Sequence, residues 1–201
     1  MGRSKQYDRT ELLDRAVELF RRQGYNGTST TELVEELGVN RKSMYAEFGS
    51  KQELFEATLE HYDRKHLTNV LAPIEASDAG LDAIRQAFTG YASASEGWFN
   101  GRGCLMCNSA VERGALDPAT GRYAAAYLHR ITRAFRNALE NGRSAGELDD
   151  AADLDELSGF LTTVLIGVAA SIRAEAPPEQ LHAAASVVTG ILGTQQPANR
   201  R

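Results

Sequence analysis

The chain has 201 residues, 42% of them hydrophobic, and a formal net charge of −5 at pH 7. A chain of this length can bury a substantial core, divided between one small and one larger unit. We find no apolar run approaching 18 residues and no apolar signal-peptide core near the start, so the sequence predicts a soluble cytoplasmic protein without a membrane partner.

The charge is unevenly distributed along the chain. Residues 1–51 hold nine Lys and Arg against eight Asp and Glu, whereas the remaining 150 residues hold thirteen against nineteen. The N-terminal part is therefore the less acidic one and the better placed to approach a polyanion. Binding there would depend on a local set of cationic and amide contacts rather than on a globally positive field.

Helices are expected throughout, because the sequence holds only five prolines and no sustained alternation of apolar and polar residues. The first helix should begin after Asp8, with Glu11 at its third position, and end at Gly24. Its apolar residues recur on one face and comprise Leu12, Leu13, Ala16, Val17 and Phe20.

Two short helices joined by a tight turn follow. Ser29 and Glu32 fit a capping box, and Gly38 supplies a left-handed stop. Asn40 is a good N-cap for the next helix, whose exposed arc of about 140° would carry Arg41, Lys42, Tyr45 and Ala46. Met44 and Phe48 would face the core, and Ser50 with Glu53 opens a further helix. This is the pattern of a helix-turn-helix, which places its second helix in the DNA major groove.

The same region resembles the DNA-binding domain of the tetracycline-repressor (TetR) family over residues 8–60. The matching residues are Gly24-Tyr25, Thr28-Ser29, Leu37-Gly38-Val39, Ser43-Met44-Tyr45, Phe48 and Ser50-Lys51-Gln52-Glu53-Leu54. Lys42, Met44 and Ala46 depart from the commonest family pattern. Lys42 and Ala46 are on the expected DNA side, so these departures concern the operator sequence rather than the family.

The resemblance implies an all-α protein with three parts: a three-helix DNA-binding domain (residues 1–52), a helical effector-binding and dimerisation domain (53–194) and a tail (195–201). It also implies a homodimeric repressor that a small molecule releases from an inverted-repeat, double-stranded DNA operator. Arg41 is the best candidate for reading bases, since arginine can hold guanine through two bonds. The expected phosphate contacts are Thr28, Ser29, Lys42, Ser43, Tyr45 and Lys51.

The helices of the larger unit are expected over residues 50–71, ending near Pro73, then 81–95 and 104–114, one from Asp117-Pro118, and finally 153–174 and 178–193. The last two carry apolar residues near a 3.5-residue period, which is typical either of protomer core or of a helical interface. The family resemblance favours a four-helix dimer interface. Its expected residues are Leu161, Leu165, Val168, Leu181, Ala184, Ala185 and Val188.

Cys104 and Cys107 form a single Cys-x-x-Cys, without the second ligand pair that a structural zinc site needs. Three interpretations stay open: buried packing residues, an electrophile- or redox-sensing pair, and lining of a ligand pocket. The four histidines show no metal-ligand spacing, so we expect no metal and no cofactor.

We find no nucleophile triad, phosphate loop or paired-carboxylate site, so an enzyme of unfamiliar helical type is a remote alternative. We expect an apolar effector pocket between the helices of the larger unit, lined mainly by bulky residues on their inner faces. They are Tyr62, Phe88, Tyr91, Trp98, Cys107, Tyr127 and Phe160. A thiol-sensing repressor using Cys104 and Cys107 is the alternative to a reversible ligand.

Overall fold

The computed structural model describes residues 7–94, 97 and 101–194, and every regular element within that part of the chain is helical. Trp98 and the tail 195–201 lie outside the described residues. The elements are α1 (Arg9–Gln23), α2 (Thr30–Leu37), α3 (Arg41–Phe48), α4 (Lys51–Tyr62), a π-helical turn η1 (Asp63–Leu67), α5 (Thr68–Glu75), α6 (Leu81–Ala94), α7 (Leu105–Arg113), α8 (Pro118–Ser144), α9 (Leu154–Arg173) and α10 (Pro178–Thr194). The all-α prediction is confirmed.

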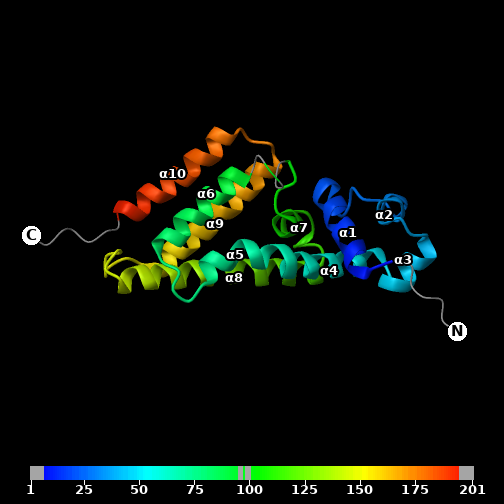
Figure 1. Ribbon diagram of the computed structural model, residues 1–201, viewed down its shortest axis with the longest axis horizontal. Helices are drawn as coiled ribbons and strands as arrows, with labels where there is room; N and C mark the ends of the chain where they lie inside the picture. The colour runs from blue at the N-terminus through cyan, green and yellow to red at the C-terminus, as the bar shows by residue number, and fades with distance from the viewer. Residues whose placement is uncertain (1–6, 95–96, 98–100, 195–201) are drawn as a thin grey trace, which may run out of the picture.

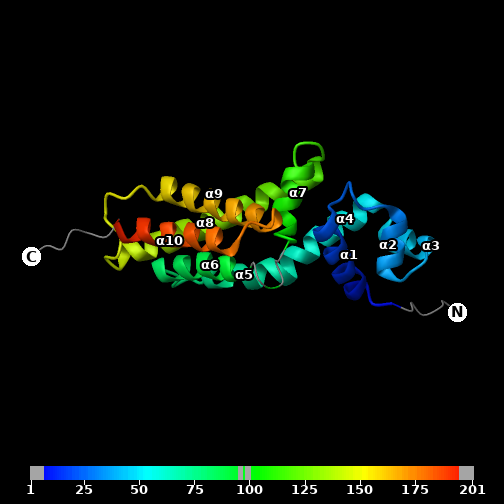
Figure 2. The same ribbon diagram turned by 90° about the horizontal axis from the view of Figure 1, so that it is seen from above.

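The molecule is elongated, with α1–α3 at one end and α6, α8, α9 and α10 at the other (Figure 1). The run from α4 through η1 to α5 connects the two ends, and the view from above shows the same separation (Figure 2). Helix α7 contacts both parts, since it packs on α1 and α4 as well as on α8 and α9.

Local capping interactions shape the N-terminal end. The Ser29 side chain accepts from the Glu32 amide, and the Glu32 carboxylate accepts from the Ser29 amide at 2.7 Å, which completes the predicted capping box. The side chain of Asn40 caps α3 by accepting from the Ser43 amide at 2.8 Å. Gly38 ends α2 with φ 66°, in the left-handed region that a glycine adopts without strain.

An aromatic cluster anchors α4 to α1. The ring of Phe55 lies edge-on to those of Phe20 and Tyr25, with centroids 4.9 Å apart in both cases. The first turns of α4 therefore pack into the N-terminal core, and the domain boundary drawn between residues 52 and 53 stays a prediction.

The helix predicted to end near Pro73 instead continues to Glu75, with Pro73 inside α5. The π-helical turn η1 lies upstream of it, and such turns shift the register of a helix locally. Arg130 of α8 spans this stretch, because it donates to Asp63 at 2.8 Å and to both oxygens of Glu75.

The predicted interface residues of α9 and α10 are corrected by the structure. Six of them, all except the partly exposed Ala184, are buried within the protomer: Leu161, Leu165, Val168, Leu181, Ala185 and Val188. They belong to the protomer's own core, because α9 packs on α8 and α10 packs on α6. The apolar repeat was therefore the core signal, and any interface on these helices must use their other faces.

Helix α9 is long and apolar enough to cross a membrane by length and composition alone. Its side chains at Leu161, Leu165 and Ala169 are buried inside the protein. A core helix of a helical protein satisfies the same criterion, and the burial of this face explains its composition.

Candidate nucleic-acid interface and its junction with the helical body

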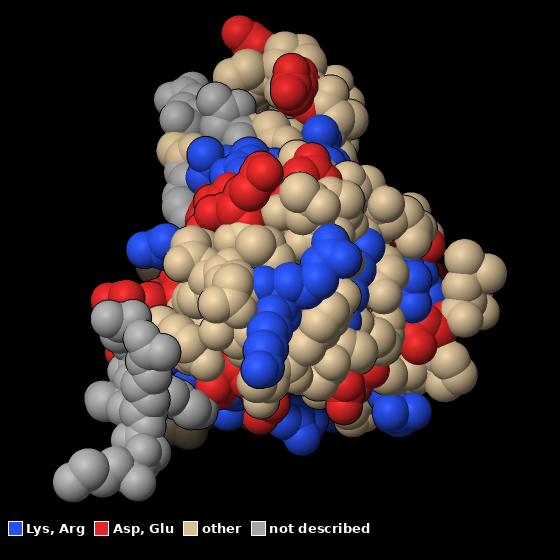
Figure 3. Space-filling model, turned by 90° about the vertical axis from the view of Figure 1, so that its right-hand side faces the viewer, with Lys and Arg blue, Asp and Glu red and all other residues tan. Residues whose placement is uncertain are grey.

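Helix α3 exposes its cationic side chains to solvent on one side and buries apolar side chains on the other. Met44 and Phe48 are buried, whereas Arg41 and Lys42 are exposed and Tyr45 is 37% exposed. The end of the molecule that carries α2 and α3 shows Lys and Arg side chains crossing the middle of its surface, with acidic residues towards the margins (Figure 3). The predicted division of α3 into a core side and an open side is thus present in the structure.

Two of the predicted phosphate contacts have internal roles in this structure. Thr28 is buried and its hydroxyl donates to the Gly24 carbonyl oxygen at 2.6 Å, so its side chain stabilises the turn after α1. The Lys51 ammonium donates to the Tyr25 carbonyl oxygen at 2.7 Å and lies 4.1 Å from the centre of the Tyr25 ring. Burial lowers the pKa of Lys51, and the neighbouring charge of Arg113 adds to this effect.

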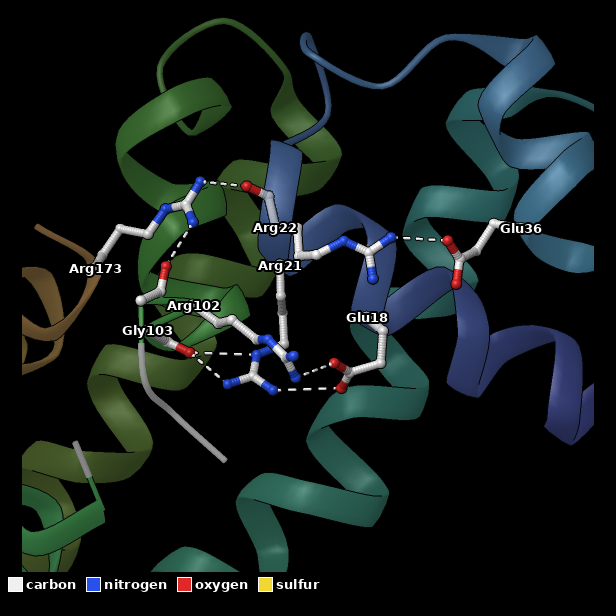
Figure 4. A network of polar contacts seen from close by, with 8 residues as sticks. Glu18, Arg21, Arg22, Glu36, Arg102, Gly103 and Arg173 are labelled. Carbon is white, nitrogen blue, oxygen red and sulfur yellow. Dashed lines mark hydrogen bonds and ion pairs between the residues drawn. The ribbon is translucent and has the colours of Figure 1, made fainter. Parts of the chain in front are cut away.

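A buried arginine connects the N-terminal end to the segment before α7. The Arg21 side chain is fully buried on α1 and donates twice to the Gly103 carbonyl oxygen, from Nη2 at 2.9 Å and from Nε at 3.3 Å. Glu18 lies between Arg21 and Arg102, with its two oxygens 3.4 and 2.7 Å from their guanidinium nitrogens (Figure 4). Gly103 has φ 59°, which aims its carbonyl at Arg21 at little conformational cost.

The last residue of α9 reaches the same place. Arg173 donates to the carbonyl oxygens of Arg22 at 2.7 Å and Gly101 at 2.9 Å (Figure 4). The C-terminal end of α1 is therefore bonded to α9 and to the segment before α7.

The other end of α7 holds the turn that leads into the helix-turn-helix. The Glu112 carboxylate accepts from the backbone amides of Tyr25 at 2.9 Å and Asn26 at 2.7 Å. The Arg113 guanidinium lies 3.9 Å from the centre of the Tyr25 ring and donates to Gln52 of α4 at 3.1 Å. These contacts and those of Arg21 form what we call the α1–α7 junction: residues 18–26 on one side, and residues 101–104, Glu112, Arg113 and Arg173 on the other.

Cys104 belongs to this junction, Cys107 follows Cys104 in α7, and both are free, buried thiols. Cys104 is the N-cap residue of α7, and its sulfur is 3.7 Å from the Tyr127 hydroxyl. Burial raises the pKa of Cys104, but hydrogen bonding from Cys107, Tyr127 and Tyr62 outweighs that effect and lowers it to about 6. The interaction with Cys104 and burial both raise the pKa of Cys107.

Among the described residues, the predicted pocket residues apart from Phe160 are divided between two cavities and the packed core. Tyr91 lines a cavity of about 330 Å³ between α5, α6 and α9, together with Leu71, Ile74, Ala87, Gly90 and Leu165. Cys107 lines another of about 320 Å³ between α1, α7 and α9, together with Gly24, Val111, Glu112, Ile166 and Arg173. Tyr62, Phe88 and Tyr127 are buried in the core, while Phe160 is 38% exposed and its prediction as an inner residue is wrong.

Comparisons with known proteins identify the fold and the family. A model described as "Bacterial regulatory proteins, tetR family" matches residues 12–58, and one described as "Tetracyclin repressor-like, C-terminal domain" matches residues 80–188. The chain is 32% identical to the transcriptional regulator YezE of Bacillus subtilis over 80% of its own length and 84% of the relative's. The chain belongs to the TetR family.

Further relatives agree with this assignment. The transcriptional repressor ComR of Escherichia coli is 30% identical, with 90% of this chain and 86% of ComR covered. A cysteine mutant of the TetR family regulator CifR, solved with 26-base-pair operator DNA, superposes with a TM-score of 0.83 at 27% identity, covering 94% of this chain and 98% of that one. This TetR family member is thus a DNA-binding transcriptional regulator of the helix-turn-helix type.

The junction residues were missed by sequence reasoning. Arg21 follows Val17 by four residues on the apolar face of α1, so a cation within a buried stripe was a signal that could have been noticed. Glu112 gives no such signal, because its partners lie more than 80 residues away.

Proposed function

We propose that this TetR family protein is a homodimeric cytoplasmic repressor that places α3 of each protomer in the major groove of an inverted-repeat operator. The observation that carries the proposal is the two-sided α3, with Met44 and Phe48 buried and Arg41, Lys42 and Tyr45 facing solvent. Relatives described as transcriptional repressors support repression rather than activation.

Arg41 at the start of α3 is our proposed base-reading residue, and Lys42, Ser43 and Tyr45 are the proposed phosphate contacts. Ser29 is exposed at the start of α2 and stays in this set. We leave Thr28 out, because its hydroxyl is engaged by Gly24 inside the protein. Lys51 is retained only as a residue to be tested, since its ammonium is bonded to Tyr25.

The test of DNA binding is selection from random duplex DNA with the purified full chain. We expect enrichment of two inverted half-sites about one or two helical turns apart, since two linked heads must reach the same side of the duplex. A variant with Arg41, Lys42 and Tyr45 all replaced by Ala keeps the buried side of α3 and is the matched control. If the unmodified chain enriches no sequence, the proposal is contradicted.

For the dimer, we propose the outer faces of α9 and α10. Phe160 of α9 is 38% exposed and Val187 of α10 is 60% exposed, and both helices lie at the end of the molecule away from the helix-turn-helix (Figure 1). At Gly167 and Gly190 an added side-chain atom would meet nothing within 4 Å, so a neighbouring helix could approach closely there. An exposed apolar surface with small residues is typical of a helix-packing interface.

Two adjacent valines of α10 test this face. Val187→Asp should give a folded monomer, because it places a charge in the proposed contact without touching the core. Val188→Asp should instead destabilise the protomer by about 3 kcal/mol or more, since Val188 is buried. Sedimentation and denaturant unfolding separate the two results, and a Val187→Asp protein that stays dimeric at micromolar concentration would place the interface elsewhere.

The cavity between α5, α6 and α9 is our proposed effector site. Its lining is mainly apolar, with Val70, Leu71 and Ile74 facing Tyr91 and Leu165, which favours an apolar ligand. Gly90 lines it with open space in front of its Cα, so Gly90→Phe should fill the cavity. Native mass spectrometry of the purified protein should detect a bound small molecule that the Gly90→Phe variant lacks, with operator affinity retained.

A further inference from the structure

We infer that Cys104 and Cys107 form a peroxide-oxidised thiol pair whose conversion to a disulfide loosens the α1–α7 junction and weakens DNA binding. The inference rests on the proposed DNA-binding function and adds a covalent signal to it. The ligand class is a small peroxide, hydrogen peroxide being the simplest, because both sulfurs are too buried for a bulky reagent.

The placement of the two cysteines favours a disulfide. Cys104 is the N-cap of α7 and Cys107 is its third residue, the two positions whose side chain and backbone meet in a helix cap. The N-cap conformation of Cys104, with φ −92° and ψ 124°, directs its side chain over the first turn. The two side chains also hydrogen-bond each other, so the sulfurs lie near each other at the start of α7.

The surroundings of Cys104 favour the thiolate, which is the reactive form. The Cys107 backbone amide and the Tyr127 hydroxyl can donate to the Cys104 thiolate, and the buried guanidinium of Arg21 provides a nearby positive charge. Despite burial, hydrogen bonding from the side chain and backbone of Cys107, and from Tyr127 and Tyr62, lowers the pKa of Cys104 and makes it the nucleophile of the pair. Cys107, with its raised pKa, holds the proton.

The cavity between α1, α7 and α9 reaches the cysteine pair at Cys107. Cys107 lines this cavity of about 320 Å³, and its side chain is 5% exposed, whereas that of Cys104 is fully buried. The cavity is large enough for a molecule of the size of hydrogen peroxide. Asn108 and Glu112 at its wall provide polar groups that can hold such a molecule.

The reaction balances in two steps. The Cys104 thiolate attacks one peroxide oxygen, the O–O bond breaks, and the departing hydroxide takes a proton from solvent, equal to the one that the Cys104 thiol released on ionising, and leaves as water. Cys107 sulfur then attacks the resulting sulfenic acid, the S–O bond breaks, and the hydroxyl group leaves as a second water with the Cys107 proton. Two thiols are oxidised to one disulfide while one peroxide is reduced to two waters.

The disulfide would act on DNA binding through Arg21. Cys104 follows Gly103, whose carbonyl oxygen accepts both bonds from Arg21 of α1. Oxidation removes the thiolate charge beside the guanidinium and pulls the start of α7 towards Cys107. Both changes weaken the contact that holds α1, and with it the helix-turn-helix, against the helical body.

The experiment uses the full chain, reduced or treated with hydrogen peroxide, and the operator obtained by selection. Peptide mapping without reductant should show residues 104 and 107 joined in the treated protein. Operator affinity should fall about tenfold or more and return with dithiothreitol, a coupling of ordinary allosteric size. A disulfide that leaves affinity unchanged, or thiols that stay free while free cysteine in the same tube is oxidised, would overturn the inference.

Three variants provide the controls. The Cys104→Ser/Cys107→Ser protein should bind the operator and not respond to peroxide, which separates thiol chemistry from methionine oxidation at Met44. Cys107→Ser should trap a sulfenic acid on Cys104. Tyr127→Phe removes one donor to the thiolate and should slow oxidation at neutral pH by about threefold or more, with the rate rising to its plateau at a higher pH.

A failure of the proposed function would look different. If reduced protein selects no DNA, the regulator proposal fails, but peptide mapping still reports whether the disulfide forms. Hydrogen exchange of the amides in residues 18–26 then reports whether the junction loosens on oxidation. Unchanged exchange in a fully oxidised protein would reject the coupling independently of any DNA.

Discussion

The helix-turn-helix end and the α1–α7 junction are held together by interactions of different range. In the former, Ser29 and Glu32 bond across three residues, and Asn40 caps Ser43 across another three. In the junction, Arg21 bonds to a carbonyl 82 residues away, and Arg173 to one 151 residues away. The first region can form from nearby sequence, whereas the second exists only when the whole chain has folded.

This difference also separates DNA recognition from its control. The helix-turn-helix keeps its shape when the larger helical part of the protein moves, because none of its helix caps depends on residues of that part. The α1–α7 junction, by contrast, is where a change in α7 can alter the orientation of α1 and of the helix-turn-helix. Variants in the junction should therefore change stability and coupling, and variants on α3 should change DNA binding alone.

The largest effect that tests this contrast is expected at Arg21. Arg21→Ala leaves the buried Gly103 carbonyl without its donor and opens a cavity, which should lower the free energy of unfolding by about 3 kcal/mol. Arg22→Ala is the matched control on the same helix, because it keeps the Arg22 carbonyl that Arg173 contacts and removes only a partly exposed pair with Glu36, worth about 0.5 kcal/mol. Urea unfolding measures both, and equal losses would contradict a special role of the junction.

In the helix-turn-helix, Arg41→Ala should lower operator affinity without loss of stability. We expect operator affinity to fall by about 1–3 kcal/mol and one base preference to be relaxed. Fluorescence anisotropy with single-base operator variants measures the effect. A loss that is uniform over all variants would make Arg41 a phosphate contact instead.

The two regions also differ in how far sequence predicts them. The three N-terminal helices, their caps at Asp8, Ser29 and Asn40, and the turn at Gly38 all followed from residues within four positions of one another, whereas the π-helical turn and the continuation of α5 past Pro73 did not. The faces of α9 and α10 did not, because the repeat at Leu161 and Leu165 is the same for core and for interface, and only packing on α8 decides between them. Arg21 and Glu112 were missed because their partners are distant in sequence.

Glu112→Gln should have a moderate effect confined to the junction. Its carboxylate accepts from two backbone amides, and a neutral side chain retains weaker bonds, so we expect a loss of about 1 kcal/mol in unfolding free energy. Hydrogen exchange at Tyr25 and Asn26 should rise specifically. Glu36→Gln is the control, and protection of those two amides that matches the parent protein would show that Glu112 does not hold the turn.

The smallest expected effects distinguish Lys42, in the first turn of α3, from Lys51, the first residue of α4. Lys42 is exposed, so Lys42→Ala should weaken binding to every DNA sequence alike and reduce the salt dependence of binding by about one ion, with stability unchanged. Lys51 is bonded to the Tyr25 carbonyl and lies over the Tyr25 ring, so Lys51→Ala should cost about 1 kcal/mol of stability and change the salt dependence less. Titrations of operator binding at several salt concentrations, together with urea unfolding, measure both quantities. Lys51→Ala could instead reduce the salt dependence by a full ion without loss of stability. The Lys51 ammonium would then leave Tyr25 to contact a phosphate, and Lys51 would belong to the DNA-binding surface rather than to the junction.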